Sequence, residues 1–163
     1  MMGRWLRSMV PFAVALAAFG IAVSWLLGQN KTLGLWLLAG FLVAHGLIHL
    51  LFVVPAPAPK SAAAPEWPFN MAGSWLVARA GLSATTVRMV GIVLVVIVVA
   101  CFALAGLATA GVVLPTDGWR IWTAGSAAAS LLLLALFAKP DLILGAGIDA
   151  VFLWVAVARV WAP

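Results

Sequence analysis

Five apolar runs, each close to the length that crosses a lipid bilayer, dominate this chain of 163 residues. A spanning helix needs about 20 mainly apolar residues. Only 8% of the residues are charged, whereas a soluble domain carries about 25% and needs them for its polar surface. The same composition excludes a disordered chain, which is poor in apolar residues. The sequence therefore predicts an integral membrane protein with a single small bundle.

Turn-forming and polar residues divide the chain between these runs. Gly28–Lys31 follows the first run, Pro55 ends the second, and Pro115–Gly118 and Lys139–Asp141 separate the last three. The predicted fold class is an all-α integral membrane bundle of five transmembrane helices, forming one polytopic domain over residues 1–163. The expected spans are about 9–27, 34–54, 89–114, 120–137 and 142–161.

The first run could be mistaken for a secretory signal peptide, because Arg4 and Arg7 precede it. Its apolar stretch is nearer to 20 residues than to the roughly 7–15 of a signal peptide. We predict that this span is retained. Cleavage after Ala15–Ala17 would leave four helices.

The connection over residues 55–87 is too rich in Trp and Phe for a free loop. Asn70 can start a short helix over Met71–Ala80, and Gly81 can stop it. We expect this interfacial helix to lie on the membrane surface or to fold back over the bundle. The segment is either a tethered linker or a lid over a cavity.

Lys and Arg set the expected orientation, because they are enriched in cytoplasmic loops. With the N-terminus inside, six of them face the cytoplasm and three face outward. Heavy use of Ala, Gly, Val, Pro and Trp, with Lys scarce beside Arg, fits a GC-rich bacterial genome. We predict a bacterial inner membrane, with a cytoplasmic N-terminus and an external C-terminus. The inner residues are Arg4, Arg7, Lys60, Arg79, Arg88 and Lys139, and the outer ones are Lys31, Arg120 and Arg159.

Charge and cysteine content exclude one class of partner and one kind of crosslink. The net charge of +5 is spread over many connections and forms no basic stripe, so we expect no nucleic-acid partner. The single Cys101 excludes an intrachain disulfide. The expected partner is the lipid bilayer, and a homo-oligomer or a larger membrane complex would also be compatible.

Four polar side chains within the predicted spans share one depth. Counted at 1.5 Å per residue, His49, Asp149, Ser130 and His45 lie roughly 7, 10, 10 and 13 Å from the same interface. His45 and His49 are four residues apart and therefore share a helix face. A charge near the bilayer centre costs at least about 2.5–3.5 kcal/mol, so Asp149 requires a partner.

Two imidazoles and one carboxylate can form a three-ligand metal site with one open position. The candidate metal ligands are thus His45, His49 and Asp149, with a divalent ion as the possible cofactor. Gly46 follows His45, so the His-Glu-x-x-His motif of zinc proteases is absent. Haem is disfavoured within one chain, because two His on one helix face cannot ligate opposite sides of the same haem.

These residues leave several functions open. Our first hypothesis is a non-catalytic multi-pass bacterial membrane protein, acting as a subunit or as a small-ligand or metal binder. The alternatives are a metal-dependent membrane enzyme acting on a lipid-like substrate, and a component of an ion or proton pathway. A purely structural polar clamp between the second and fifth spans would use the same residues.

Overall fold

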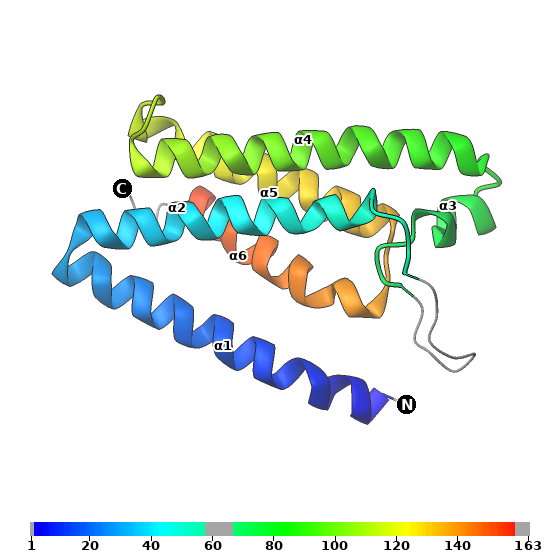
Figure 1. Cartoon of the computed structure of the whole chain (residues 1–163), viewed down its shortest axis with the longest axis horizontal. Coiled ribbons are helices and arrows are strands. Elements are labelled where there is room, and N and C mark those ends of the chain that lie inside the picture. The colour runs from blue at the N-terminus through cyan, green and yellow to red at the C-terminus, as the bar shows by residue number, and fades with distance from the viewer. Residues whose placement is uncertain (1, 58–66, 159–163) are drawn as a thin grey trace.

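The computed structural model describes residues 2–57 and 67–158, with side chains from residue 10 onward. Within these ranges the chain is helical and contains no strand (Figure 1). The described residues form five helices that are long and apolar enough to cross a membrane, as the sequence predicts. They are α1 (Met2–Gln29), α2 (Lys31–Ile48), α4 (Ala84–Ala110), α5 (Trp119–Leu136) and α6 (Ile143–Ala158).

Short polar residues fix where two of these helices begin, α2 and α4. Asn30 is the single residue between α1 and α2, and its side chain caps α2 by accepting a hydrogen bond from the Leu33 backbone N–H at 3.1 Å. Ser83 caps α4 in the same way, by accepting from the Thr86 N–H at 3.0 Å. Helix α4 ends at Ala110 rather than at the expected residue 114, because Gly111 takes the left-handed conformation at φ 67°.

The long helices pack in chain order: α1 on α2, α2 on α4, α4 on α5, and α5 on α6. Helices α2, α4, α5 and α6 surround one apolar core that includes the fully buried Phe102, Val98 and Leu133. Side chains from α6 then reach α2 across the bundle, where the Phe41 and Phe152 ring centroids are 5.8 Å apart. The arrangement places one face of α2 opposite one face of α6.

Two glycines allow α2 and α4 to cross closely. A Cβ atom at Gly46 would lie 2.6 Å from the Cβ of Phe102, and one at Gly106 would lie 2.9 Å from the Ala39 carbonyl oxygen. Neither separation is sterically possible without movement of the backbone or of a buried ring. These close approaches fix the position and rotation of α2, and with it the direction of the His45 and His49 side chains.

The connection between α2 and α4 folds against the end of α5. After the 3-10 turn η1 (His49–Phe52), it contains η2 (Met71–Gly73) and α3 (Trp75–Ala78), and residues 58–66 lie outside the described part. The expected single helix over Met71–Ala80 is therefore two short pieces, broken at Ser74. Ser74 is extended at ψ 140° and caps α3 instead of continuing η2.

Two side-chain hydrogen bonds hold this connection in place. The Ser74 hydroxyl donates to the Leu136 carbonyl oxygen at 2.6 Å, and the Trp75 indole N–H donates to the Ala135 carbonyl oxygen at 2.9 Å. Both acceptors belong to the last turn of α5, whose carbonyls have no partner within the helix. Met71 is buried and packs into the core. The segment from Met71 to Ala78 is thus attached to the bundle.

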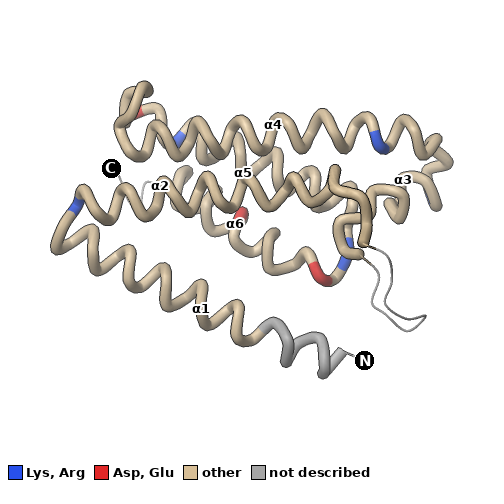
Figure 2. Tube along the Cα trace, in the orientation of Figure 1, with Lys and Arg blue, Asp and Glu red and all other residues tan. Residues whose placement is uncertain are grey.

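Among the residues coloured in Figure 2, the charged ones lie near the ends of the long helices or in the connections, apart from one. The exception is the acidic position halfway along α6. Asp149 is the acidic residue of that helix and is 0% exposed. The fold therefore places one acidic side chain in the interior of a bundle whose core is mainly apolar.

A buried cluster of two histidines, a serine and an aspartate

Helix α2 and the turn after it position both histidines. His45 lies in α2 and His49 begins η1, four residues later. The His49 Nδ1 atom lies 3.1 Å from the His45 carbonyl oxygen and 3.3 Å from that of Gly46. A carbonyl can only accept, so Nδ1 carries the proton and Nε2 of His49 points into the bundle. The backbone of α2 thereby sets both the tautomer and the orientation of this ring.

Helices α5 and α6 supply the remaining two members, Ser130 and Asp149. One carboxylate oxygen of Asp149, Oδ1, accepts from His45 Nε2 at 2.9 Å. The other, Oδ2, accepts from the Ser130 hydroxyl at 2.5 Å. The Ser130 oxygen also lies 2.7 Å from His49 Nε2. Ser130 therefore bridges the carboxyl group and the second imidazole, and all four residues form one hydrogen-bonded cluster.

These hydrogen bonds require one proton more than an ionised carboxylate allows. The four contacts are His45 with Asp149, Ser130 with Asp149, Ser130 with His49, and His49 with the backbone, and each needs a hydrogen. Two neutral imidazoles and one hydroxyl supply three hydrogens. When Ser130 donates to Asp149 Oδ2, the fourth hydrogen lies on His49 Nε2, and when Ser130 donates to His49 instead, it lies on Asp149 Oδ2. In either form the cluster carries no net charge, which suits its burial.

Aromatic rings surround the His45 imidazole. Its centroid lies 5.0 Å from that of Phe102, 5.7 Å from that of Phe152 and 6.2 Å from that of Phe41. His45 is 5% exposed, His49 is 4%, and Ser130 and Asp149 are fully buried. The cluster therefore lies in an apolar, enclosed surrounding, where an unpaired polar group would be expensive.

The three predicted metal ligands come close enough to share an ion. One ligand atom from each of His45, His49 and Asp149 lies within 4.8 Å of the others. In a tetrahedral zinc site with bonds of about 2.0–2.2 Å, ligand atoms are about 3.4 Å apart. The backbone carbonyl that holds His49 Nδ1 is the kind of outer contact that orients metal-bound histidines. The donor set fits a divalent ion after a small inward movement of the side chains.

The same residues do not form a Ser–His–Asp catalytic triad. In a triad the acid contacts the histidine that takes the proton from the serine. Here Asp149 contacts His45, whereas Ser130 contacts His49 and also Asp149 directly. The geometry therefore gives no support to Ser130 as an activated nucleophile.

The structure brings together all three residues singled out as ligands in the sequence, although Asp149 is 104 residues from His45 in the chain. Their role as metal ligands stays a prediction. Ser130 was expected at the same depth but was not placed among the ligands, and the structure makes it the bridge. The phenylalanines around His45 carry no local signal in the sequence, because Phe is common in every span.

Comparison with known proteins finds no family model that matches this chain, no similar curated protein and no similar solved structure. The class that fold and site define is a membrane-type bundle with five long helices among the described residues and a buried, hydrogen-bonded cluster of His45, Ser130, Asp149 and His49.

Proposed function

We propose that this chain is a multi-pass protein of a bacterial inner membrane that binds a divalent metal ion, best matched by zinc, at His45, His49 and Asp149. The protein acts as a non-catalytic subunit or binder. The observation that carries the proposal is the convergence of three ligand atoms within 4.8 Å inside a fully buried layer. Borderline-soft zinc accepts both imidazole nitrogen and carboxylate oxygen.

Binding of a metal ion at this site would displace a proton from the cluster. Ligands bind metal as neutral imidazoles and an ionised carboxylate. The hydrogen-bonded cluster holds one shared proton between Asp149, Ser130 and His49, so this proton leaves when the metal enters. The Ser130 bridge opens at the same time, because His49 Nε2 turns from the hydroxyl to the metal.

Metal analysis of the purified full chain tests this function. The expected result is about one zinc per chain in protein prepared without chelator, and its loss in His45→Ala and His49→Ala. Ser126→Ala is the matched control, because the Ser126 hydroxyl is buried but donates to the Thr123 carbonyl oxygen outside the cluster. Wild-type protein that stays metal-free after incubation with zinc, cobalt and manganese would contradict the proposal.

Proton handling is the second candidate, and the shared proton favours it. A net-neutral chain from Asp149 through Ser130 to His49 can move a proton between an acid and a base over two short hydrogen bonds. Proton uptake or release by the metal-free protein, measured with a pH indicator, would support this candidate. If the purified wild-type protein contains zinc that only a chelator removes, metal binding is the favoured function.

The membrane arrangement belongs to the same proposal. The N-terminus is cytoplasmic, the C-terminus is external, and the segment Met71–Ala78 lies at the inner surface, as the distribution of Lys and Arg indicates. A C-terminal reporter enzyme that works only outside the cytoplasm supports this orientation. Cytoplasmic activity of that reporter would reverse it.

A further inference from the structure

Ser130 stands where a fourth metal ligand would stand in the buried cluster. Its hydroxyl oxygen lies 2.7 Å from His49 Nε2 and 2.5 Å from Asp149 Oδ2. The other oxygen of the same carboxyl group, Oδ1, lies 2.9 Å from His45 Nε2. Short contacts therefore link polar atoms of all four residues. An ion that binds both His49 Nε2 and Asp149 has the serine oxygen next to two of its ligands.

A tetrahedral ion has one more position than the three proposed ligands fill. In catalytic zinc sites water or substrate takes the fourth position, and in structural sites a fourth protein ligand takes it. Ligand atoms around such an ion are about 3.4 Å apart. The Ser130 oxygen, now 2.7 Å from His49 Nε2, would recede by only about 0.7 Å to reach that spacing. A small adjustment of one side chain thus completes the coordination.

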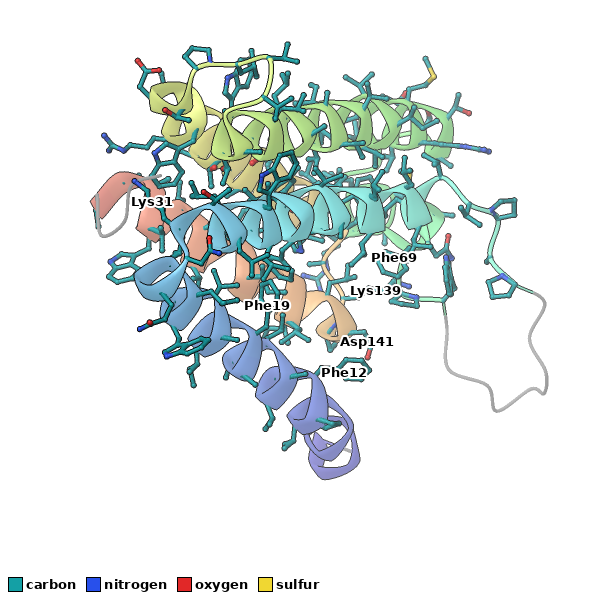
Figure 3. The ribbon with its side chains drawn as sticks, turned by 60° about the vertical axis from the view of Figure 1, so that its left-hand side comes forward. Phe12, Phe19, Lys31, Phe69, Lys139 and Asp141 are labelled. Carbon is teal, nitrogen blue, oxygen red and sulfur yellow. The ribbon has the colours of Figure 1, made fainter. Side chains whose placement is uncertain are left out.

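Aromatic rings close the cluster on the side of α1. The apolar groove between α1, α2 and α6 is lined by Phe41 and Phe152 but by no member of the cluster. Both rings also contact the His45 ring, at centroid distances of 6.2 and 5.7 Å. Phe19 of α1 (Figure 3) packs on Phe41, with the two ring centroids 4.7 Å apart. Water in the groove is therefore kept from the cluster by packed side chains.

A second group of rings closes the cluster toward the end of α5. Phe52 lies one 3-10 turn after His49 in η1. Its ring centroid is 5.2 Å from that of Phe69 in the connection and 5.8 Å from that of Phe137. Phe69 lies at the same end of the bundle as Lys139 (Figure 3). Water from this end would have to pass the packed rings, so the fourth ligand is more readily supplied by the protein.

The neighbouring serine on α5 shows that the orientation of Ser130 is specific. Ser126 is also fully buried, but its hydroxyl donates to the Thr123 carbonyl oxygen of its own helix at 3.0 Å. Serine within a helix commonly bonds to a carbonyl of the preceding turn in this way. The Ser130 hydroxyl instead contacts side chains of two other elements, His49 of η1 and Asp149 of α6. Its oxygen therefore faces the cluster.

We propose that Ser130 is the fourth ligand of the metal ion, and this inference rests on the proposed metal binding at His45, His49 and Asp149. The hydroxyl binds the ion in its neutral form and keeps its hydrogen bond to Asp149 Oδ2, while Oδ1 binds the ion. Only the shared proton leaves the cluster. The coordination shell is then completed by the chain itself, with two nitrogens and two oxygens, and has no position for a substrate. A closed shell of this kind suits a non-catalytic metal site.

Cobalt substitution tests this ligand through a spectroscopic signature. The full-length protein in a Cys101→Ala background is purified, freed of metal and titrated with Co²⁺ alone. Ser130→Cys places a thiol at the proposed ligand position, and a thiolate bound to cobalt adds a charge-transfer band in the near ultraviolet. Ser126→Cys is the matched control, because it lies one turn away on the same helix with its side chain bonded outside the cluster. We expect the band in Ser130→Cys and none in Ser126→Cys.

Two further measurements keep the test independent of that variant. Azide shifts the visible absorption of cobalt that has an open position, so we expect no shift in the parent Cys101→Ala protein. Ser130→Ala should raise the Kd for cobalt about tenfold or more, whereas Ser126→Ala should leave it within about twofold.

The outcomes separate this inference from the metal site on which it rests. An azide shift in the parent protein, or cobalt bound to Ser130→Cys without the charge-transfer band, would overturn Ser130 as a ligand and leave the three-ligand site standing. Failure of the parent protein to bind cobalt would overturn the metal site, and the fourth ligand with it.

Discussion

His45 and Asp149 are 104 residues apart in the chain, yet His45 Nε2 lies 2.9 Å from Asp149 Oδ1. This contact joins α2 to α6, whose backbones otherwise approach each other less closely than neighbouring helices in the bundle do. The contact therefore connects the first and last helices of the group α2, α4, α5 and α6. Its loss should affect both assembly of the bundle and the chemistry of the cluster.

Asparagine at position 149 should separate these two effects. In Asp149→Asn, the amide oxygen can accept from His45, and the amide NH₂ can donate to Ser130, which then donates to His49. All four hydrogen bonds survive without a shared ionisable proton. We expect the free energy of unfolding of Asp149→Asn to stay within about 1 kcal/mol of the wild-type value. Unfolding in detergent, followed by Trp fluorescence, measures it. Zinc binding should be lost, because a neutral amide is a poor zinc ligand.

Asp149→Ala provides the contrast, because it leaves His45 and Ser130 without partners. We expect a loss of about 2 kcal/mol or more in the free energy of unfolding. Equal stability of the Asn and Ala variants would show that hydrogen bonding at this position contributes little. A strongly destabilised Asn variant would contradict the proposed proton count.

Gly46→Ala should destabilise the protein by about 1–3 kcal/mol, the usual result of overpacking a core. The new methyl group would lie 2.6 Å from the Phe102 Cβ and would push α2 away from α4. Gly40→Ala is the control on the same helix, where a Cβ has open space and alanine favours the helix. Thermal unfolding of both variants measures the difference. Equal midpoints would indicate that the crossing can relax.

Much of this fold can be predicted from the sequence, because helix length and chain breaks are local properties. The five apolar runs and the residues between them give the number of long helices. The spacing of His45 and His49 gives their shared face, and counting residues gives the depth of Asp149. Each of these inferences needs only the geometry of one helix.

The rest depends on how helices pack against each other. That α6 faces α2, with Ser130 of α5 between them, follows from close crossings such as Gly46 against Phe102. The position of a glycine in an apolar span does not predict which side chain of another helix will pack against it. The break at Ser74 also has a tertiary cause, since its hydroxyl donates to the end of α5. Helix α1 diverges from the other long helices as it runs away from its turn with α2 (Figure 1), and no local pattern in the sequence predicts this.

Ser74→Ala should loosen the connection between α2 and α4. The variant loses the 2.6 Å hydrogen bond to Leu136 and the cap of α3, whereas the Trp75 contact with Ala135 remains. We expect faster cleavage in the 67–83 region by a protease of broad specificity, with little change in global unfolding. Ser83→Ala, which alters a cap on α4 but not this attachment, is the comparison. Equal cleavage rates in Ser74→Ala and wild type would argue that packing of Met71 alone holds the segment.

Metal affinity should rise with pH, because zinc and the shared proton compete for the same cluster. The metal-free cluster holds one extra proton among Asp149, Ser130 and His49, and the metal-bound form requires neutral imidazoles and an ionised carboxylate. Release of one proton per zinc makes Kd about tenfold lower for each unit of pH rise, as long as the free cluster keeps that proton. Binding calorimetry in two buffers with different ionisation enthalpies measures the number of protons released. A value of one agrees with the hydrogen-bond count, whereas a value near zero would mean that the carboxyl group is already ionised and that His49 is neutral before metal arrives.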